Sequence, residues 1–145
     1  MNRGMEARCY SVGGQGDPTE ARGKLVQKHP SLLVQAVRAD IAVNEFFVEM
    51  LCAETLRAKA SHVLLARKPE IDLLLRLAST TQISVAIAKA GAKKGAPFLL
   101  IASGDSKTMR SLRVPSNWKR LPRAALSAAE LDRIERAALL NAARG

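Results

Sequence analysis

Reactive and metal-binding side chains are scarce in this chain. Among its 145 residues there are two cysteines, Cys9 and Cys52, and two histidines, His29 and His62. The two cysteines stand too far apart for a zinc motif, and a single pair makes no disulfide framework, so we expect both thiols to be reduced and buried. With so few thiols and imidazoles, we expect no catalytic residues, no metal and no cofactor.

The chain also has no hydrophobic run long enough to cross a membrane. Its apolar stretches, such as Pro97–Ala102, are far shorter than the roughly 20 residues that a bilayer-spanning helix needs. The N-terminus has no apolar core of the kind found in secretory signal peptides. We therefore expect a cytoplasmic protein with no membrane partner, folded as one domain over residues 1–145.

Aromatic residues are few, whereas basic residues concentrate in the middle of the chain. Aromatics make up 3% of the sequence, and Phe47 and Phe98 stand at expected core positions. No base-stacking platform like that of RNA-recognition sheets is therefore expected. Residues 56–125 hold 14 Lys and Arg but 3 Asp and Glu, a net charge of +11, whereas the whole chain carries +10. Such a concentrated field attracts polyanions, of which nucleic acid is the commonest.

The basic residues of this segment form three clusters. One cluster alone is usually a solvated face, but three with few acids between them favour a surface that binds phosphates. An ordinary basic surface remains the alternative interpretation. The clusters are Arg57, Lys59, Arg67 and Lys68; then Lys89, Lys93 and Lys94; and then Lys107, Arg110 and Arg113.

Alternating extended and helical patterns predict an α/β fold. We expect one domain with a central mixed sheet of about four strands flanked by helices, and helical crossovers favour some parallel pairing. Helices are expected over 18–28, 44–59, 82–90 and 106–113, with a last helix opened by the capping box Ser127–Glu130. A proline-containing loop is expected over 114–123. The expected strands are Met5–Val12, Ser31–Val43, Ile71–Ala78 and Phe98–Ala102.

The expected helices over 44–59 and 82–90 each show an apolar stripe. In the first, Phe47, Met50, Leu51 and Glu54 have helical spacing, which leaves Glu45 and Glu49 on the exposed side. In the second, the expected buried stripe is Ile83, Ala86, Ile87 and Ala90.

A polar turn connects the expected strand over 71–78 to the helix that follows. One of the hydroxyl groups of Ser79, Thr80 and Thr81 is expected to cap the helix, and the free N–H groups of a helix N-terminus can hold a phosphate. On the strand, Asp72 is a conceivable general base, although a buried ion pair with Arg76 or a neighbouring lysine is the competing interpretation.

Residues 71–95, IDLLLRLASTTQISVAIAKAGAKKG, resemble the small tRNA-binding subunit of the KEOPS complex, in its archaeal form. The shared pieces are Ser79 of the turn, Gln82-Ile83, the short alanine-rich helix, the turn Gly91-Ala92-Lys93 and the apolar strand after it. The chain departs from the family in three places. The segment between the expected long helix and Ile71 is longer than usual. Thr80 stands where a glycine is frequent, and Asn141 stands where the last helix usually has an acidic residue.

The resemblance implies a non-catalytic subunit with two partners, the KEOPS kinase/ATPase and tRNA. It would recruit tRNA through the 3′ single-stranded tail, for threonylcarbamoyladenosine modification by a separate catalytic subunit. No small-molecule substrate is expected. The residues expected to contact tRNA are Arg57, Lys59, Arg67, Lys68, Arg76, Ser79, Thr80, Thr81, Gln82, Ile83, Lys93 and Lys94, and those expected to dock the kinase are Leu131, Ile134 and Leu139.

Two other functions stay open at this point. Kink-turn RNA-binding proteins also have a Lys-rich helix followed by an apolar strand, but this chain lacks their Gly-x-Asn-Glu helix start. The second alternative is a small enzyme built around an unrecognised carboxylate, for which Asp72 is the candidate.

Overall fold

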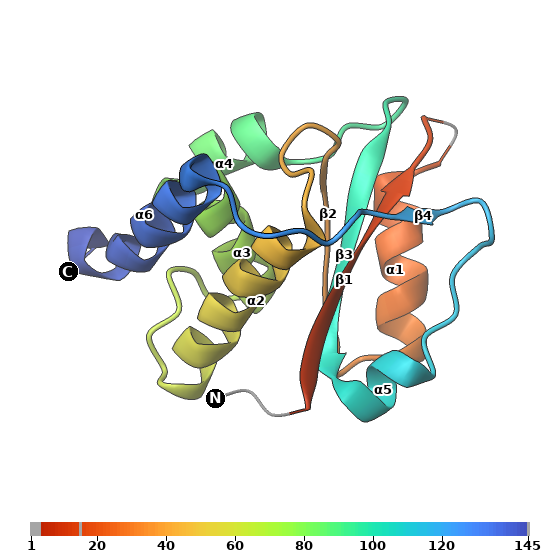
Figure 1. The fold of residues 1–145 in the computed structure, drawn as a ribbon, viewed down its shortest axis with the longest axis horizontal. Helices are drawn as coiled ribbons and strands as arrows, with labels where there is room; N and C mark the ends of the chain where they lie inside the picture. Colours follow the sequence, from red (N-terminus) through yellow and green to blue (C-terminus); the bar gives the residue numbers. More distant parts are fainter. Residues whose placement is uncertain (1–3, 15, 145) are drawn as a thin grey trace.

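A computed structural model describes residues 4–14 and 16–144. The chain forms a four-stranded sheet with helices on both faces (Figure 1), which confirms the α/β class. The strands are β1 (Met5–Val12), β2 (Leu33–Arg38), β3 (Phe98–Asp105) and β4 (Lys119–Arg120). The helices are α1 (Pro18–Lys28), α2 (Glu45–Ala60), α3 (Pro69–Ala78), α4 (Ile83–Ala90), α5 (Ser106–Arg110) and α6 (Ala128–Arg144).

The sheet has the strand order β2-β3-β1-β4, and each neighbouring pair is antiparallel. Strands β1 and β3 pair along their full length, from Met5 opposite Asp105 to Val12 opposite Phe98. The expectation of a mixed sheet is therefore wrong. The connection from β2 to β3 runs through α2, α3 and α4, and it brings the chain back to the sheet in the direction opposite to β2.

The segment expected to be a strand over Ile71–Ala78 is helix α3. Leucines at 73, 75 and 77 fit a period of two, but Leu74 and Ile71 complete a helical face just as well, and every residue from 72 to 78 is buried. Asp72 and Arg76 stand four residues apart on one side of the helix, but they pair with each other inside the protein, so the helix has no solvent-facing polar stripe and the leucine run also fits a buried strand. The better signal is Pro69, which stands at the first turn of the helix, where a proline is favoured.

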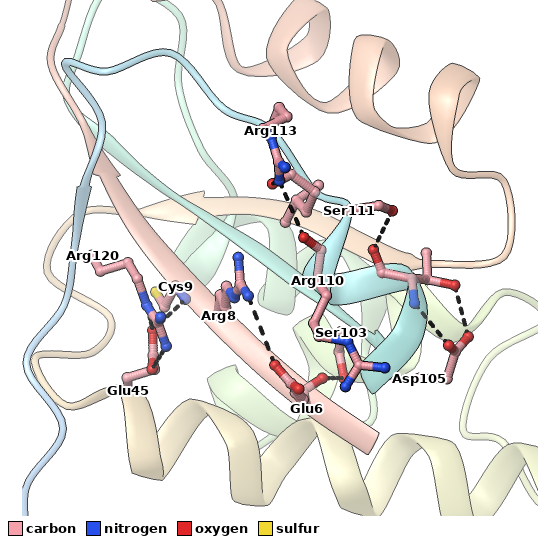
Figure 2. Close-up of polar contacts among 12 residues, drawn as sticks. Glu6, Arg8, Cys9, Glu45, Ser103, Asp105, Arg110, Ser111, Arg113 and Arg120 are labelled. Atoms are coloured by element: carbon pink, nitrogen blue, oxygen red, sulfur yellow. Dashed lines mark hydrogen bonds and ion pairs between the residues drawn. The ribbon is translucent and has the colours of Figure 1, made fainter. Parts of the chain in front are cut away.

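Strand β4 lies inside the segment expected to be a loop, and a buried carboxylate holds it in place (Figure 2). Glu45 was expected on the exposed side of its helix, but it is 1% exposed. Its Oε2 accepts hydrogen bonds from the Cys9 amide and from Arg120 Nε, each at 3.0 Å. This bond raises the pKa of Arg120 above its ordinary value. The short strand thus depends on a tertiary contact 75 residues away in sequence.

The core consists of two apolar layers, one on each face of the sheet. Helices α2, α3, α4 and α6 cover one face, and α1 and α5 cover the other (Figure 1). The expected core residues Phe47 and Phe98 are both fully buried. Cys9 and Cys52 are buried free thiols, as expected, and burial raises the pKa of Cys52 to about 12, which keeps the thiol protonated.

Candidate nucleic-acid interface

In the polar turn between α3 and α4, Ser79 adopts the left-handed backbone conformation. Ser79 has a φ of 55°, and the Thr80 amide donates to the Leu75 carbonyl at 3.1 Å, which closes the end of α3. Among the described non-glycine residues, positive φ angles occur at His62 and Ser79 and not at Thr80. A threonine in place of the glycine frequent in the KEOPS subunit therefore fits the backbone here.

Helix α4 exposes more apolar surface than the sequence pattern predicts. Ala86 and Ala90 are fully buried, as expected, but Ile83 and Ile87 are 47% and 53% exposed. Only the narrow alanine face of this eight-residue helix packs on the rest of the protein. The two isoleucines are left on the surface, where they are available to a partner.

These isoleucines form one wall of a groove of about 580 Å³, which we call the α4 groove. Its other walls come from the start of α1, from β2 and from the start of α3. Apolar side chains such as Leu74 and Ile71 line it, and Arg67 and Lys68 stand on its rim. Three of the expected tRNA-contacting residues, Arg67, Lys68 and Ile83, are thus brought together around one apolar hollow.

The polar groups along this groove leave a net positive charge. The single carboxylate among its lining residues, Glu70, is paired with Arg22 at 2.9 Å. Arg67 and Lys68 are exposed and form no ion pair with the described residues. Arg22 Nε also donates to the Val34 carbonyl on the outer edge of β2, so part of this strand edge is already satisfied. The α4 groove therefore offers apolar surface and free cations.

The other expected tRNA-contacting residues lie at two further places or in the turn itself. Lys93 lines a smaller hollow of about 380 Å³ beside Arg38, in the connection from α4 to β3, and Lys94 is exposed next to it. Arg57 and Lys59 are exposed at the end of α2. Thr81 and Gln82 are exposed, whereas Ser79 and Thr80 are half-buried.

Arg76 is buried and does not line the α4 groove, which corrects its expected role. Its side chain is 2% exposed, and its Nε and Nη2 donate to the two carboxylate oxygens of Asp72 at 2.7 and 3.1 Å. Nη1 donates to the carbonyl of Ala137 on α6 at 2.9 Å. Arg76 is therefore a structural residue, because its guanidinium group is sequestered inside the protein, where a bound tRNA could not contact it.

The same geometry argues against Asp72 as a catalytic base. Beyond Arg76, its carboxylate accepts hydrogen bonds from Thr55 Oγ1 at 2.6 Å and from the Leu65 amide at 2.9 Å. The side chain is fully buried. The interpretation of Asp72 and Arg76 as a buried ion pair is confirmed, and the carboxylate has no solvent-facing position from which to take a proton from a substrate.

Helix α6 uses part of its expected docking face for its own packing. Leu131 and Leu139 are 48% and 66% exposed. Ile134 is partly buried against the core, so it is not free for a partner in this arrangement. Arg133 anchors the helix, because its guanidinium group donates to the Leu77 carbonyl at 3.1 Å and lies 4.4 Å from the centre of the Phe47 ring.

Glu54 is a titratable residue that the sequence pattern placed in the apolar stripe of α2. Glu54 is 8% exposed, and among the described residues its Oε1 has no hydrogen-bond partner. It lines a cavity of about 230 Å³ with Arg57 and Arg76. Burial raises its pKa from 4.5 to about 7, although the two arginines oppose this rise. A glutamate at a buried helical position was the signal available in the sequence.

The raised pKa of Glu54 predicts that this side chain lowers the stability of the folded protein in a pH-dependent way. Between pH 4.5 and 7, the folded protein holds a proton that the unfolded chain has released, so stability falls as the pH rises through this window. We expect Glu54→Gln to increase the free energy of unfolding by about 1–2 kcal/mol above pH 7, after allowance for solvent screening, and by nearly nothing at pH 4.5. Urea denaturation across this range measures the difference. The exposed Glu135→Gln is the control, and an equal gain at every pH would contradict the assignment.

Comparison with known proteins adds no identification. No protein-family model matches the chain, and no curated protein sequence matches it.

Within the described residues, no group of three or more His, Cys, Asp and Glu side chains could hold a metal ion. In the same part of the chain, no single helix is long and apolar enough to cross a bilayer, and α3 with α4 passes that test only as a pair bent by 69°. The site must therefore be interpreted from its own geometry.

Proposed function

We propose that this protein is a non-catalytic tRNA-binding adaptor, equivalent to the small tRNA-binding subunit of the KEOPS complex. In this role it holds the 3′ single-stranded tail of tRNA while a separate subunit makes threonylcarbamoyladenosine. The observation that carries the proposal is the α4 groove, where an apolar hollow meets two unpaired cations within the basic half of the chain.

The chemistry of the α4 groove suits an unpaired nucleotide better than a duplex. Single-stranded RNA ends present unstacked bases, which proteins bind through apolar contacts. Ile83 and Ile87 supply exposed apolar surface for a base, and Arg67 and Lys68 stand beside them for the adjoining phosphates. Lys93 and Lys94 would contact the next part of the backbone, since they follow α4 directly.

The second partner in this proposal is the KEOPS kinase/ATPase, docked on α6. Leu131 and Leu139 are the exposed apolar residues of this helix that fit the role. Because Arg133 and Ile134 fasten the opposite side of α6 to the core, the helix is a rigid platform for a partner. This docking depends on the resemblance and on those two leucines.

The proposal is tested by removing the tRNA tail. We expect trimmed tRNA, or tRNA with its tail annealed to a complementary oligonucleotide, to bind about tenfold or more weakly than intact tRNA, because the base contacts are lost. Gel-shift titration at fixed salt measures the ratio. Equal affinity for intact and trimmed tRNA would reject the tail as the ligand, and stronger binding to a kink-turn duplex would favour that alternative.

A further inference from the structure

A second groove also borders α1, along residues that the α4 groove does not use. It has a volume of about 940 Å³ and runs between α1 and the segment Arg113–Trp118. Figure 1 shows this segment rising from α5 towards β4, on the face of the sheet that α1 covers. The proposed tRNA and kinase contacts use none of the residues that line it. We call it the Trp118 groove.

Trp118 gives this groove an aromatic wall. The indole is partly buried, lines the groove, and lies with its ring centre 6.0 Å from that of Tyr10, tilted by 55°. The contact with Tyr10, whose ring belongs to the core, restrains the indole. Val114 and Pro115 extend the apolar wall along the same segment. A restrained aromatic ring at the side of a groove is a surface on which a planar ligand can stack.

One end of the groove is basic. Lys28 is exposed in the last turn of α1 and forms no ion pair with the described residues. Arg113 donates from Nη1 to the carbonyls of Arg110 and Leu112, each at 3.1 Å, which orients its guanidinium group (Figure 2). The remaining N–H groups of Arg113 form no hydrogen bond with the described residues, so Lys28 and Arg113 provide positive charge and free donors for an anionic group.

The other end of the groove carries hydrogen-bond acceptors. Asp17 caps α1 through Oδ1, which accepts from the Thr19 amide at 3.0 Å, and Glu20 follows in the first turn. Glu20 is paired with Lys24 at 3.0 Å, with both side chains exposed. Because α1 has 11 residues, about 16 Å separates its acidic start from Lys28. A ligand that suits this groove has a planar ring, donors at one end and negative charge at the other.

We propose that the Trp118 groove binds a nucleotide. The base stacks on the indole, the phosphate binds Lys28 and Arg113, and the carboxylates of Asp17 and Glu20 accept hydrogen bonds from ribose hydroxyls or from an exocyclic amine. A free mononucleotide and one nucleotide of a bound RNA strand share this chemistry. The site is separate from the α4 groove, so it stands whether or not the tRNA tail binds there.

The experiment uses Trp118 itself, the one tryptophan in the chain. We expect AMP, CMP or a single-stranded oligoribonucleotide to quench its fluorescence saturably. Saturation by mononucleotides at a similar nucleotide concentration indicates a free-nucleotide site, and saturation by the oligonucleotide at a far lower concentration indicates a strand. No saturable change with any of the three overturns the proposal. A response to an apolar peptide alone also overturns it, because the groove then docks a protein.

Charge-reversal variants locate the site. Lys28→Glu and Arg113→Glu are each expected to lower the affinity for the quenching ligand about tenfold, because each variant loses a charge-assisted contact to phosphate. Arg136→Glu makes the same charge change on the exposed side of α6 and is expected to leave the titration unchanged. Equal quenching in all three variants would overturn the assignment.

Discussion

Replacing Arg76 with alanine is expected to lower the free energy of unfolding by about 3–5 kcal/mol. The substitution leaves the Asp72 carboxylate fully buried without its main partner, and it removes the bond from Nη1 to the Ala137 carbonyl that ties α6 to α3. It also leaves Asn141 Oδ1 without the 3.0 Å bond from Nη2. Urea denaturation followed by circular dichroism measures the loss.

The chain offers a closely matched control for this prediction. Arg136 pairs with Asp132 at the same spacing of four residues and at 2.9 Å, but with side chains that are 68% and 56% exposed. Exposed pairs of this kind contribute about 0.3–0.5 kcal/mol, so Arg136→Ala is expected to have little effect on stability. Equal losses for Arg76→Ala and Arg136→Ala would contradict the assigned role of burial.

Binding measurements separate the structural role of Arg76 from the tRNA contact that the sequence pattern suggested. If Arg76 touched tRNA, Arg76→Lys would weaken tRNA binding and leave stability unchanged. A buried bidentate arginine predicts the reverse, because lysine cannot supply the two parallel bonds to Asp72. We therefore expect the melting temperature to fall and the remaining folded protein to bind tRNA as the wild type does.

Reversing the charges of Arg67 and Lys68 together is expected to reduce affinity for intact tRNA by about 10- to 100-fold. Both side chains stand on the rim of the α4 groove without an ion-pair partner among the described residues, so they are free to bind phosphates. Each lost phosphate contact should also lower the slope of log affinity against log salt by about one. Fluorescence anisotropy titrations at several salt concentrations measure both quantities.

A second double variant serves as the control for net charge. Lys107→Glu with Arg110→Glu makes the same change in total charge on exposed residues of α5, on the other face of the sheet. We expect a smaller loss of affinity, because only the long-range field changes. Equal losses and equal salt slopes for the two double variants would mean that tRNA follows the overall charge, and the α4 groove would then not be its binding site.

Local signals in the sequence predicted most of the helix boundaries correctly. Asp17, Asn44 and the Ser127–Glu130 capping box open α1, α2 and α6 as expected, because their side chains satisfy free amides of the first turn. These bonds span two or three residues, so the sequence contains all the information that they need. The basic clusters were equally visible, because charge is a property of composition.

Local signals failed to predict two elements, α3 and β4, whose secondary structure depends on long-range packing. The leucine-rich segment 71–78 fits a strand and a buried helix equally well, and only the packing of α3 among α2, α4 and α6 selects the helix. Strand β4 has two residues, pairs with β1, and is held there by the bonds between Arg120 and Glu45. Apart from Pro69 at the start of α3, neither element has a signal within its own few residues, since both depend on side chains that meet only in the folded chain.

By itself, the sequence determined the α/β class, the capped helices and the excess of positive charge in the central segment. The tertiary structure decided which of those cations are available to a ligand. It sequesters Arg76 with Asp72 and leaves Arg67 and Lys68 on the rim of an apolar hollow, beside isoleucines that the helical pattern had assigned to the core. The physical reason is that exposure depends on neighbours distant in the chain, whereas charge and capping belong to the residues themselves.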